Sequence, residues 1–510
     1  MTLKCPQCLH DNVIRKGYCS DTGKQRFKCK ACGHRTVSPL GINYDDPSID
    51  RTSVYDKVRE VKKKRRWLIT SAQNATPVFQ PALSACMTWC SHNSGELIVI
   101  PNRYKNPTSL FTDKDHDWWH PALAPNLVDQ RIELCKGLVL LADIKVVPTA
   151  KNPLTGMEGF TGSNSCIVGH PHYQFHTVAT RAGDLAKIMT TTGSITLPNY
   201  TNSKAGKSGD HHHSLGAVVV EWDGECFHIR KVGFENDGSF IDWDKRYTVG
   251  GVEKAPRPKS LVLGDLHQWF VDDDADKATF DFLIPTLNPE KVVLHDVLDS
   301  YSISHHARND PFIRWAKHHF NKGNVRTEIE DLASFLGKRM QQGIDYFIIP
   351  SNHDDHITRF IKEVDWRTDL ENAEFYLETA LYMLRNTKMV EGGSHTPRPF
   401  DYWMNKLLPE VNILERDKSF MVGDVEHSFH GDVGPNGARG SAKNLSKIGV
   451  KTTIGHGHSP MVVDACYQVG VMAPSMVYAS GPSGWMVSHV LQYANNKRTH
   501  VHIIKGRCKG

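Results

Sequence analysis

The sequence lacks a long hydrophobic run. No stretch of its 510 residues approaches the 18 apolar residues that a membrane-spanning helix needs. Its first residues, Met1 to Cys5, contain no signal-peptide core. We therefore expect a cytoplasmic protein with no membrane segment. In that compartment its 12 cysteines are expected to bind metal or to stay buried as thiols rather than to form disulfides.

The chain also lacks a strong overall charge, but its charges are unevenly distributed. The net charge is +5, whereas residues 1–70 alone contain 16 Lys and Arg against 7 Asp and Glu. A basic N-terminal part on a mildly acidic body indicates that the N-terminus meets a polyanion. At this length, two to four domains are expected.

Four cysteines near the N-terminus are spaced as metal ligands. Cys5 and Cys8 form one C-x-x-C pair, and Cys29 and Cys32 form a second. Four thiolates from two such pairs match tetrahedral Zn²⁺. Because a module this short lacks core area, the metal would supply most of its folding free energy. We predict a zinc ribbon with one structural Zn²⁺ at residues 1–38.

Basic and aromatic residues surround these cysteines. The run from Gly23 to Gly33, GKQRFKCKACG, resembles the zinc ribbons at the N-termini of insertion-sequence transposases, and the resemblance covers residues 4–37. It implies a ribbon that contacts DNA; a ribbon used for protein contacts or oligomerisation is the alternative. The candidate DNA contacts in the ribbon are Arg15, Lys16, Arg26 and Lys28.

Residues 39–66 are predicted to form a linker that ends in a basic run. Its first part contains several proline, glycine, aspartate and serine residues, and the run with a helical face extends from Lys57 to Arg66. Charge runs are usually only solvated, but beside a nucleic-acid module phosphate contact is the competing interpretation. The candidates are Lys62, Lys63, Lys64, Arg65 and Arg66.

Residues 67–255 show α/β alternation without a catalytic motif. Strands are predicted at 67–70, at 96–100 and within 137–147, with a helix at 79–92 and a hairpin around Asp223-Gly224. Gly206-Lys207-Ser208 superficially resembles a phosphate-binding loop, but position 201 is threonine and no helical pattern follows, so we reject it. We expect His211 to His213 in a polar loop. A substrate-binding, oligomeric or architectural role stays open for this domain.

Five polar clusters follow apolar or β-prone runs in the last predicted domain, residues 256–510. The first is Asp265-Leu266-His267, which follows the triplet Leu261 to Leu263 and a glycine. Such triplets predict buried strands of a parallel or mixed sheet, with sites at their carboxyl ends. The other clusters contain Asp296 and Asp299, Asn352 and His353, His430, and His456 and His458. One Asp-x-His spacing could be an accident, but five such clusters together indicate one metal site.

The ordered motifs D-x-H, D-x-x-D, N-H-D, H-G and G-H-x-H resemble those of the calcineurin-like metallophosphoesterases. The resemblance covers about residues 258–507 and implies a four-layer α/β sandwich with two metals at the strand ends. It implies that Asp265, His267 and His458 hold the first metal. The second metal would be held by Asn352, His430 and His456, with Asp296 bridging both. His353 would act near the scissile phosphate as an acid or electrostatic stabiliser, and Asp299 would support the site.

The chemistry fits these residue types. Oxygen and nitrogen donors without a thiolate suit Mn²⁺, our first choice, or Fe or Zn²⁺. Two ions about 4 Å apart can bind a phosphodiester, lower the pKa of a water molecule and stabilise the attacking and leaving oxygens. The chain departs from the family pattern at His295 and Ser351, where glycines are usual, so we expect altered local turns. Ser300-Tyr301 replaces the Arg-Gly of the family's protein Ser/Thr phosphatases, which counts against that activity.

Between the second and third clusters, His305, His306 and Arg308 are further candidate contacts to a nucleic-acid backbone, with a solvated helix face as the alternative. Residues 357–386 have a helical period and predict an inserted helical segment, and residues 467–504 predict closing strands.

These features together predict a metal-dependent DNase with a DNA-binding zinc ribbon. The combination resembles calcineurin-like nucleases of DNA repair and early DNA-degrading or DNA-transfer proteins of tailed phages, which would act in the host cytoplasm. One alternative is a phosphatase or phosphodiesterase acting on nucleotides or small molecules, with the ribbon used for assembly. The other is a DNA-binding regulator with a vestigial phosphoesterase domain. Assembly into a homo-oligomer stays open.

Overall fold

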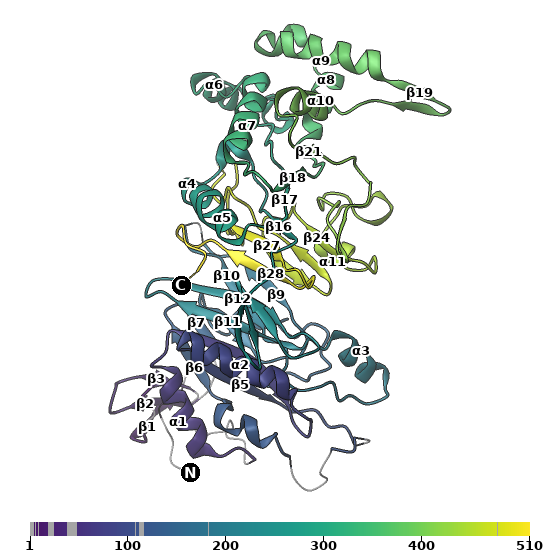
Figure 1. Ribbon diagram of the computed structural model, residues 1–510. Helices are drawn as coiled ribbons and strands as arrows, with labels where there is room; N and C mark the ends of the chain where they lie inside the picture. The colour runs from purple at the N-terminus through teal and green to yellow at the C-terminus, as the bar shows by residue number, and fades with distance from the viewer. Residues whose placement is uncertain are drawn as a thin grey trace. The chain divides into compact units, whose positions relative to one another are not determined.

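The structure is a computed structural model that divides into two compact units (Figure 1). It describes residues 5, 7–8, 10–18, 25–37, 48–107, 109–111, 117–181, 183–476 and 478–509. The N-terminal unit comprises Met1–Thr180, Asp184–Ala255 and Lys509–Gly510, and the C-terminal unit comprises Arg181–Gly183 and Pro256–Cys508. Both units combine helices with several sheets, which agrees with the general α/β class. Within the described ranges, no helix is long and apolar enough to cross a membrane.

The N-terminal unit begins with a small antiparallel sheet and a helix. The sheet consists of β1 (Val13–Tyr18), β2 (Gln25–Cys29) and β3 (Arg35–Thr36), and the helix is α1 (Arg51–Val61). The predicted helical face of the basic run lies partly in α1, which starts earlier than expected, at Arg51 within the predicted linker. Asp50 caps this helix by accepting from the backbone N–H groups of Thr52 and Ser53. Residues 38–47 of the predicted linker lie outside the described residues.

The body of the N-terminal unit contains three further groups of paired strands. One sheet has the order β12-β11-β4-β5, with β12 (Phe227–Gly233), β11 (Gly216–Trp222), β4 (Arg66–Gln73) and β5 (Glu96–Asn102). Helix α2 (Gln80–Asn93) joins the parallel strands β4 and β5. Another five strands pair in the order β9 (Phe175–Val178), β10 (Lys187–Thr191), β8 (Ser165–Val168), β7 (Leu138–Leu141) and β6 (Arg131–Cys135). Strands β13 (Phe240–Asp242), β14 (Lys245–Thr248) and β15 (Gly251–Lys254) form the third group. The predicted strands, helix and hairpin of this region are confirmed.

Helix α3 (Lys204–His212) corrects one expectation for this unit. Gly206-Lys207-Ser208 lies inside α3, so the expectation that no helix occurs here was wrong. Ser203 starts this helix because its side chain accepts from the backbone N–H of Gly206. A phosphate-binding loop would precede a helix, and its rejection therefore stands. The histidine run is no polar loop either, since it ends α3 and His213 Nδ1 lies 2.8 Å from the Tyr200 hydroxyl.

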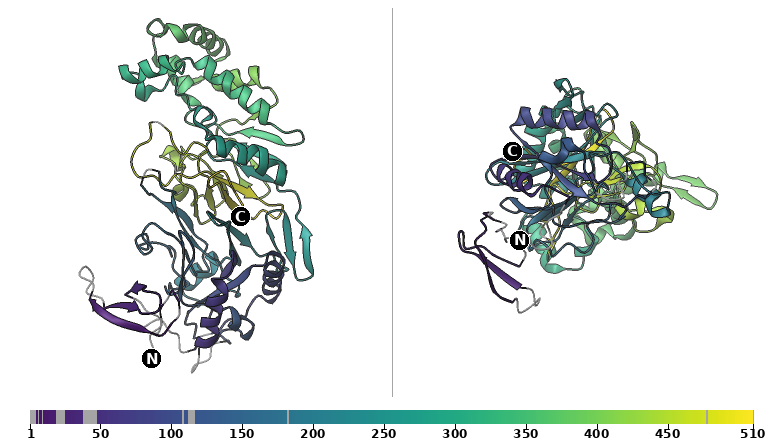
Figure 2. Two further views of the ribbon diagram at one scale, coloured as in Figure 1. Left: turned by 90° about the vertical axis from the view of Figure 1, so that its left-hand side faces the viewer. Right: turned by 90° about the horizontal axis from the view of Figure 1, so that it is seen from below.

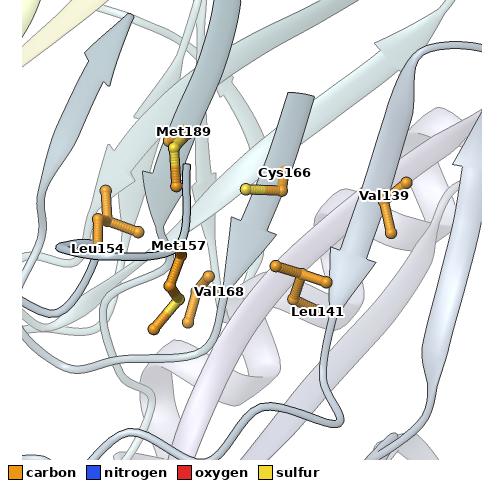
Figure 3. Packing of buried hydrophobic residues seen from close by; sticks show 7 residues of the cluster. All are labelled: Val139, Leu141, Leu154, Met157, Cys166, Val168 and Met189. Carbon is orange, nitrogen blue, oxygen red and sulfur yellow. The ribbon is translucent and has the colours of Figure 1, made fainter. Parts of the chain in front are cut away.

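A buried hydrophobic cluster packs β7, β8 and β10 against the loop before β8 (Figure 3). It consists of Val139, Leu141, Leu154, Met157, Cys166, Val168 and Met189. Burial raises the pKa of the Cys166 thiol to about 11, so this cysteine stays protonated and unreactive. Every cysteine that the structure describes is free, which agrees with the prediction that none forms a disulfide.

Two groups of paired strands form the main sheets of the C-terminal unit. One has the order β21-β18-β17-β16-β27-β28, and the other has the order β22-β23-β24-β26-β25. The first comprises β21 (Asn412–Ile413), β18 (Asp345–Ile348), β17 (Lys291–Leu294), β16 (Ser260–Val262), β27 (Ser488–Gln492) and β28 (Arg498–His502). The second comprises β22 (Met421–Val422), β23 (Val425–Glu426), β24 (Lys451–Ile454), β26 (Cys466–Gln468) and β25 (Met461–Val463). The closing strands are confirmed as β26, β27 and β28.

Helices occupy the connections between these strands. After β16 come α4 (Asp273–Asp276), a π-helical segment (Lys277–Leu283) and α5 (Ile284–Leu287), and after β17 come α6 (Pro311–His319) and α7 (Val325–Arg339). Between β18 and β21 lie α8 (Asp355–Glu363), α9 (Ala373–Asn386), the hairpin β19 (Lys388–Val390) and β20 (Gly393–His395), and α10 (Pro399–Leu407). The short helix α11 (Ala442–Leu445) precedes β24. Helices α6 to α10 lie grouped together (Figures 1 and 2), and the predicted helical segment is confirmed as α8 and α9. The four-layer sandwich layout stays a prediction.

Candidate metal centre

The five polar clusters stand where strands of the C-terminal unit end. Strands β16, β17 and β18 are parallel neighbours, and the residues that follow them are Asp265, Asp296 and Asn352. Strands β23 and β24 are parallel neighbours in the second sheet, and His430 and His456 follow them. Because parallel neighbours end at the same edge of a sheet, side chains far apart in the sequence meet there.

The side chains predicted to hold the first metal lie together. The Nε2 atoms of His267 and His458 are 3.1 Å apart, and His458 Nε2 is 3.2 Å from Asp265 Oδ2. Asp296 Oδ2 lies 3.8 Å from His267 Nε2. Ligands that bind one ion at about 2.0–2.2 Å are themselves separated by roughly 3–4 Å. These four residues therefore can hold a metal ion, since one ligand atom of each lies within 4.8 Å of the others.

The side chains predicted to hold the second metal form an adjoining group. Asn352 Oδ1 lies 3.2 Å from His430 Nε2 and 3.1 Å from His456 Nδ1. His430 Nε2 is also 3.1 Å from Asp296 Oδ2. Asp296 belongs to both groups, as the bridging position requires.

Two buried carboxylates of this centre lack hydrogen bonds. Asp265 and Asp296 are 0% and 1% exposed, and their four carboxylate oxygens have no hydrogen-bond partner among the described residues. Their close polar neighbours are ring nitrogens of His430 and His458. Burying unpaired carboxylates is costly, and bound cations would offset that cost. The residues present therefore fit two divalent ions, and their oxygen and nitrogen donors suit Mn²⁺, Fe and Zn²⁺ alike.

Opposite charges at the centre outweigh the effect of burial. Burial alone would lower the pKa of His430, but the charge of Asp296 raises it to about 9. Burial alone would raise the pKa of Asp296, but the charges of His430 and His353 hold it well below its usual range. The centre is thus built to keep its shared carboxylate ionised.

Four of the predicted ligands adopt strained backbone conformations. His267, Asp296, His456 and His458 have φ angles of +44°, +40°, +69° and +55°, which side chains with a Cβ rarely adopt. Such conformations persist where the surrounding structure enforces them, and they cluster at functional sites. Gly455 contributes space, because a Cβ there would lie 2.3 Å from Asp265 Oδ1.

His353 and Asp299 lie beside the first group. His353 Nδ1 lies 2.8 Å from the backbone oxygen of Asp299 and must carry a proton to donate to it, which leaves Nε2 for other partners. Asp299 Oδ1 accepts from His267 Nδ1 at 2.8 Å, a contact that fixes the orientation of this imidazole. Burial would lower the pKa of His353, but the charges of Asp296 and Asp299 raise it above its usual value. The charges of Asp296 and Asp299 therefore stabilise the protonated imidazole of His353.

Sequence reasoning missed Tyr478, whose hydroxyl donates to Asp299 Oδ1 at 2.6 Å. No motif surrounds Tyr478, and only the fold brings it to Asp299. It also missed His356, which lies in the first turn of α8 with its ring centroid 5.1 Å from that of His353.

The two departures from the family pattern occupy packed positions. His295 is fully buried, and its Nδ1 lies 3.4 Å from Nδ1 of His430. Burial, together with the charge of His430, lowers the pKa of His295 to about 3 and keeps it neutral. The backbone N–H of Ser351 donates to Asp354 Oδ2 at 3.1 Å, which closes the turn that contains Asn352 and His353. Neither residue displaces a predicted ligand from the centre.

The four predicted zinc ligands also lie together. Cys5 Sγ is 3.6 Å from Cys32 Sγ, and Cys8 Sγ is 3.5 Å from Cys29 Sγ, with all four atoms within 4.8 Å of one another. A tetrahedral site with zinc–sulfur bonds of about 2.3 Å separates its sulfurs by about 3.8 Å. A backbone hydrogen bond from Cys32 lowers the pKa of Cys29 to about 7, which favours a thiolate. This cluster can hold one Zn²⁺.

The cations predicted to contact DNA differ in their exposure and in whether they are already paired within the chain. On the ribbon, Arg15, Lys16 and Arg26 are exposed and Lys28 is half-buried. In the basic run, Lys62 donates to the Gln7 backbone oxygen, Lys63 pairs with Glu60, Lys64 with Glu96 and Arg66 with Glu221, and Arg65 stacks on Trp222. In the C-terminal unit, the rings of His305 and His306 are 3.8 Å apart and Arg308 lies 3.9 Å from Glu363. The positive charge offered by the basic run is therefore smaller than its sequence suggests.

No family model matches the chain. The chain is 29% identical over 469 residues to the protein named Protein A1 of Escherichia phage T5, and this similarity covers 88% of the chain and 83% of the phage protein. The similarity supports a phage origin. It extends over both compact units, since neither alone accounts for 88% of the chain.

Proposed function

We propose that this chain is a phage-encoded DNase of the calcineurin-like metallophosphoesterase type, which hydrolyses phosphodiester bonds with two metal ions. The observation that carries the proposal is the pair of buried carboxylates, Asp265 and Asp296, without hydrogen bonds and beside four imidazoles. The phage relative supports a phage function.

Each side chain has a distinct role in this proposal. Asp265, His267, His458, Asn352, His430 and His456 would hold the ions, with Asp296 shared between them. The ions, when bound, polarise the phosphodiester and activate water. Asp299 orients His267 through its Nδ1 proton. His353, anchored through Nδ1, can donate a proton from Nε2 to the leaving alkoxide.

A cavity in the C-terminal unit supports a nucleic-acid substrate. Its volume is about 570 Å³, and Ser302, Arg308, Arg314, Trp315 and Lys317 are among its lining residues. Trp315 is 72% exposed and offers a face on which a base can stack, and Arg314 can contact a phosphate. Arg308 lies 3.9 Å from Glu363, and Lys317 is buried and donates to the Ser302 backbone oxygen, so these two cations are less available.

Hydrolysis assays on two kinds of substrate test the proposal. The protein loaded with Mn²⁺ is incubated with labelled duplex and single-stranded DNA, and separately with bis(p-nitrophenyl) phosphate. We expect cleavage of DNA that stops on chelation of the metal and in the variant Asp296→Asn. Cleavage of the small diester alone would favour a phosphodiesterase of nucleotides or small molecules. Failure on both substrates with two metals bound would favour a DNA-binding regulator.

A further inference from the structure

One loop of the C-terminal unit lies behind the first predicted metal site. This support loop, residues 470–476 and 478–486, joins β26 to β27. Its ends are tied together, because the backbone N–H of Val471 donates to the Met486 oxygen at 3.0 Å. It also has a small apolar core, which consists of Val471, Ala473 and Met476 with Phe270 and Trp485 packed against them. The loop is therefore anchored by contacts that do not depend on a metal ion.

The support loop holds Asp265 through its backbone. The N–H of Asp265 donates to the Gly470 oxygen at 3.0 Å, and the N–H of Met472 donates to the Asp265 oxygen at 2.8 Å. These two bonds form a parallel β-bridge between Asp265 and Val471. A ligand whose main chain is already fixed loses less conformational freedom when it binds an ion.

Tyr478 of the loop reaches His267 through Asp299. The Tyr478 hydroxyl donates to Asp299 Oδ1 at 2.6 Å, and the same oxygen accepts from His267 Nδ1 at 2.8 Å. Two donors on one oxygen fix this carboxylate, which in turn fixes the imidazole of His267. The other ring nitrogen of His267, Nε2, is the one that lies 3.1 Å from His458 Nε2 in the first metal site. Partners behind a metal ligand set its orientation in this way.

Trp485 of the loop lies against His458. Their ring centroids are 4.5 Å apart and the rings are nearly perpendicular, at 79°. The next residue, Met486, donates its backbone N–H to the His458 oxygen at 3.4 Å. His458 has a φ angle of +55°, a conformation that persists only where its surroundings enforce it. The loop thus contacts, directly or through Asp299, each residue predicted to bind the first metal alone.

The second metal site is supported differently. Within the part of the chain that the structure describes, the side chains of Asn352, His430 and His456 make their hydrogen bonds, ion pairs and ring contacts with one another, with Asp296 and with His295. None of these contacts involves the support loop. The two sites therefore share Asp296 but differ in what lies behind their other ligands.

We propose that the support loop sets the affinity of the first metal site and leaves the second unaffected, with Tyr478 and Trp485 as positioning residues. The inference rests on the proposed two-metal function, because it concerns the ions which that function requires. It makes the two sites unequal through side chains that donate no ligand atom. Changes in the loop are expected to release one ion and keep the other.

Stepwise binding of Mn²⁺ to the full chain tests the inference without relying on turnover. The metal-free protein is titrated with Mn²⁺, and the free ion is followed by its electron paramagnetic resonance spectrum. We expect two bound ions in the wild type. Tyr478→Phe and Trp485→Leu should each weaken one binding step about 10–100-fold, the usual effect of losing a partner behind a ligand, and leave the other step unchanged. Trp485→Phe keeps an aromatic ring against His458 and should bind more like the wild type.

Two variants away from the centre are matched controls. The Tyr376 hydroxyl donates to the Ile361 backbone oxygen at 2.7 Å, so Tyr376→Phe also removes one hydrogen bond from a half-buried tyrosine. Trp366→Leu removes a half-buried indole between α8 and α9. Both should bind two ions as the wild type does. Tyr478→Phe removes a single oxygen atom and keeps the ring, so it tests the inference even if Trp485→Leu fails to fold.

Ligand variants identify which ion is affected. In a His430→Ala chain the first site keeps its ligands, and adding Tyr478→Phe should weaken the remaining ion. In a His458→Ala chain the second site keeps its ligands, and adding Tyr478→Phe should change nothing. Equal loss at both steps, or no loss in either loop variant, would overturn the inference and leave the two-metal centre standing. A wild-type chain that binds no Mn²⁺ would instead overturn the proposed function, and the inference with it.

Discussion

At the scale of single residues, Asp296 is the position on which both predicted metal sites depend. It is the carboxylate that lies 3.1 Å from His430 Nε2 in one group and 3.8 Å from His267 Nε2 in the other. We expect Asp296→Asn to remove metal and activity together, as measured by elemental analysis and hydrolysis of bis(p-nitrophenyl) phosphate. Asp345→Asn, at an exposed carboxylate at the start of β18, is the control. Retention of two bound ions by Asp296→Asn would contradict the shared position.

His353 should affect turnover without affecting metal binding. Its Nδ1 donates to the backbone oxygen of Asp299. Burial would lower the pKa of His353, but the charges of Asp296 and Asp299 raise it, so His353 can serve as a proton donor. We expect His353→Asn to keep its metals while its rate falls about 10²–10⁴-fold, the usual effect of losing a general acid. A rate equal to that of the wild type would exclude His353 from the chemistry.

Glu328 should make stability depend on pH. It is fully buried and accepts hydrogen bonds from the backbone of Tyr301 and Ser302, and burial raises its pKa from an ordinary 4.5 to about 7. The folded state thus holds a proton that the unfolded state releases, and stability falls as pH rises from 4.5 to 7. The loss is about 3 kcal/mol at most. Glu328→Gln should flatten this slope in urea denaturation, whereas Glu330→Gln, exposed on the same helix, should not. Parallel slopes for all three proteins would contradict the raised pKa.

At the scale of elements, α6 is expected to bind the nucleic acid. Arg314 and Trp315 line the 570 Å³ cavity, while Phe312 is 77% exposed on the same helix without lining it. We expect Trp315→Ala and Arg314→Ala each to reduce DNA cleavage about tenfold, in line with a loss of 1–3 kcal/mol per stacked base. Hydrolysis of the small diester should be unchanged, and Phe312→Ala should match the wild type on both substrates. An equal loss on both substrates would show that α6 supports the fold rather than the substrate.

Some elements of the fold and of the candidate site could be predicted from the sequence, and others could not. Strand ends followed by ligand-type side chains are local patterns, so β16, β17 and β18 and the residues after them could be predicted. Ion pairs between residues far apart in the sequence could not be predicted. Arg66 pairs with Glu221 and Lys64 with Glu96 only in the folded chain, so the basic run has less free positive charge for phosphate contacts than its sequence suggests. The end of helix α1 was predicted as the helical face that starts at Lys57. Its first turns were missed because aspartate favours both turns and helix starts, and only the buried valines of α1 distinguish the two.

At the scale of the whole molecule, the predicted zinc ribbon and the candidate metal centre belong to different units, so substitutions in the ribbon should leave the centre active. The ribbon's exposed cations and its four clustered thiols make it the part expected to add DNA affinity. We expect Cys29→Ser with Cys32→Ser to lose one zinc and to weaken DNA binding, measured by fluorescence anisotropy at fixed salt. Hydrolysis of bis(p-nitrophenyl) phosphate should persist, because every predicted ligand of the metal centre lies in the C-terminal unit. If both readouts fell together while the chain lost its folded circular dichroism spectrum, the ribbon would be a folding element instead. If zinc were lost while DNA affinity stayed at the wild-type value, the ribbon's cations would not contact DNA, and protein contacts would become its expected role.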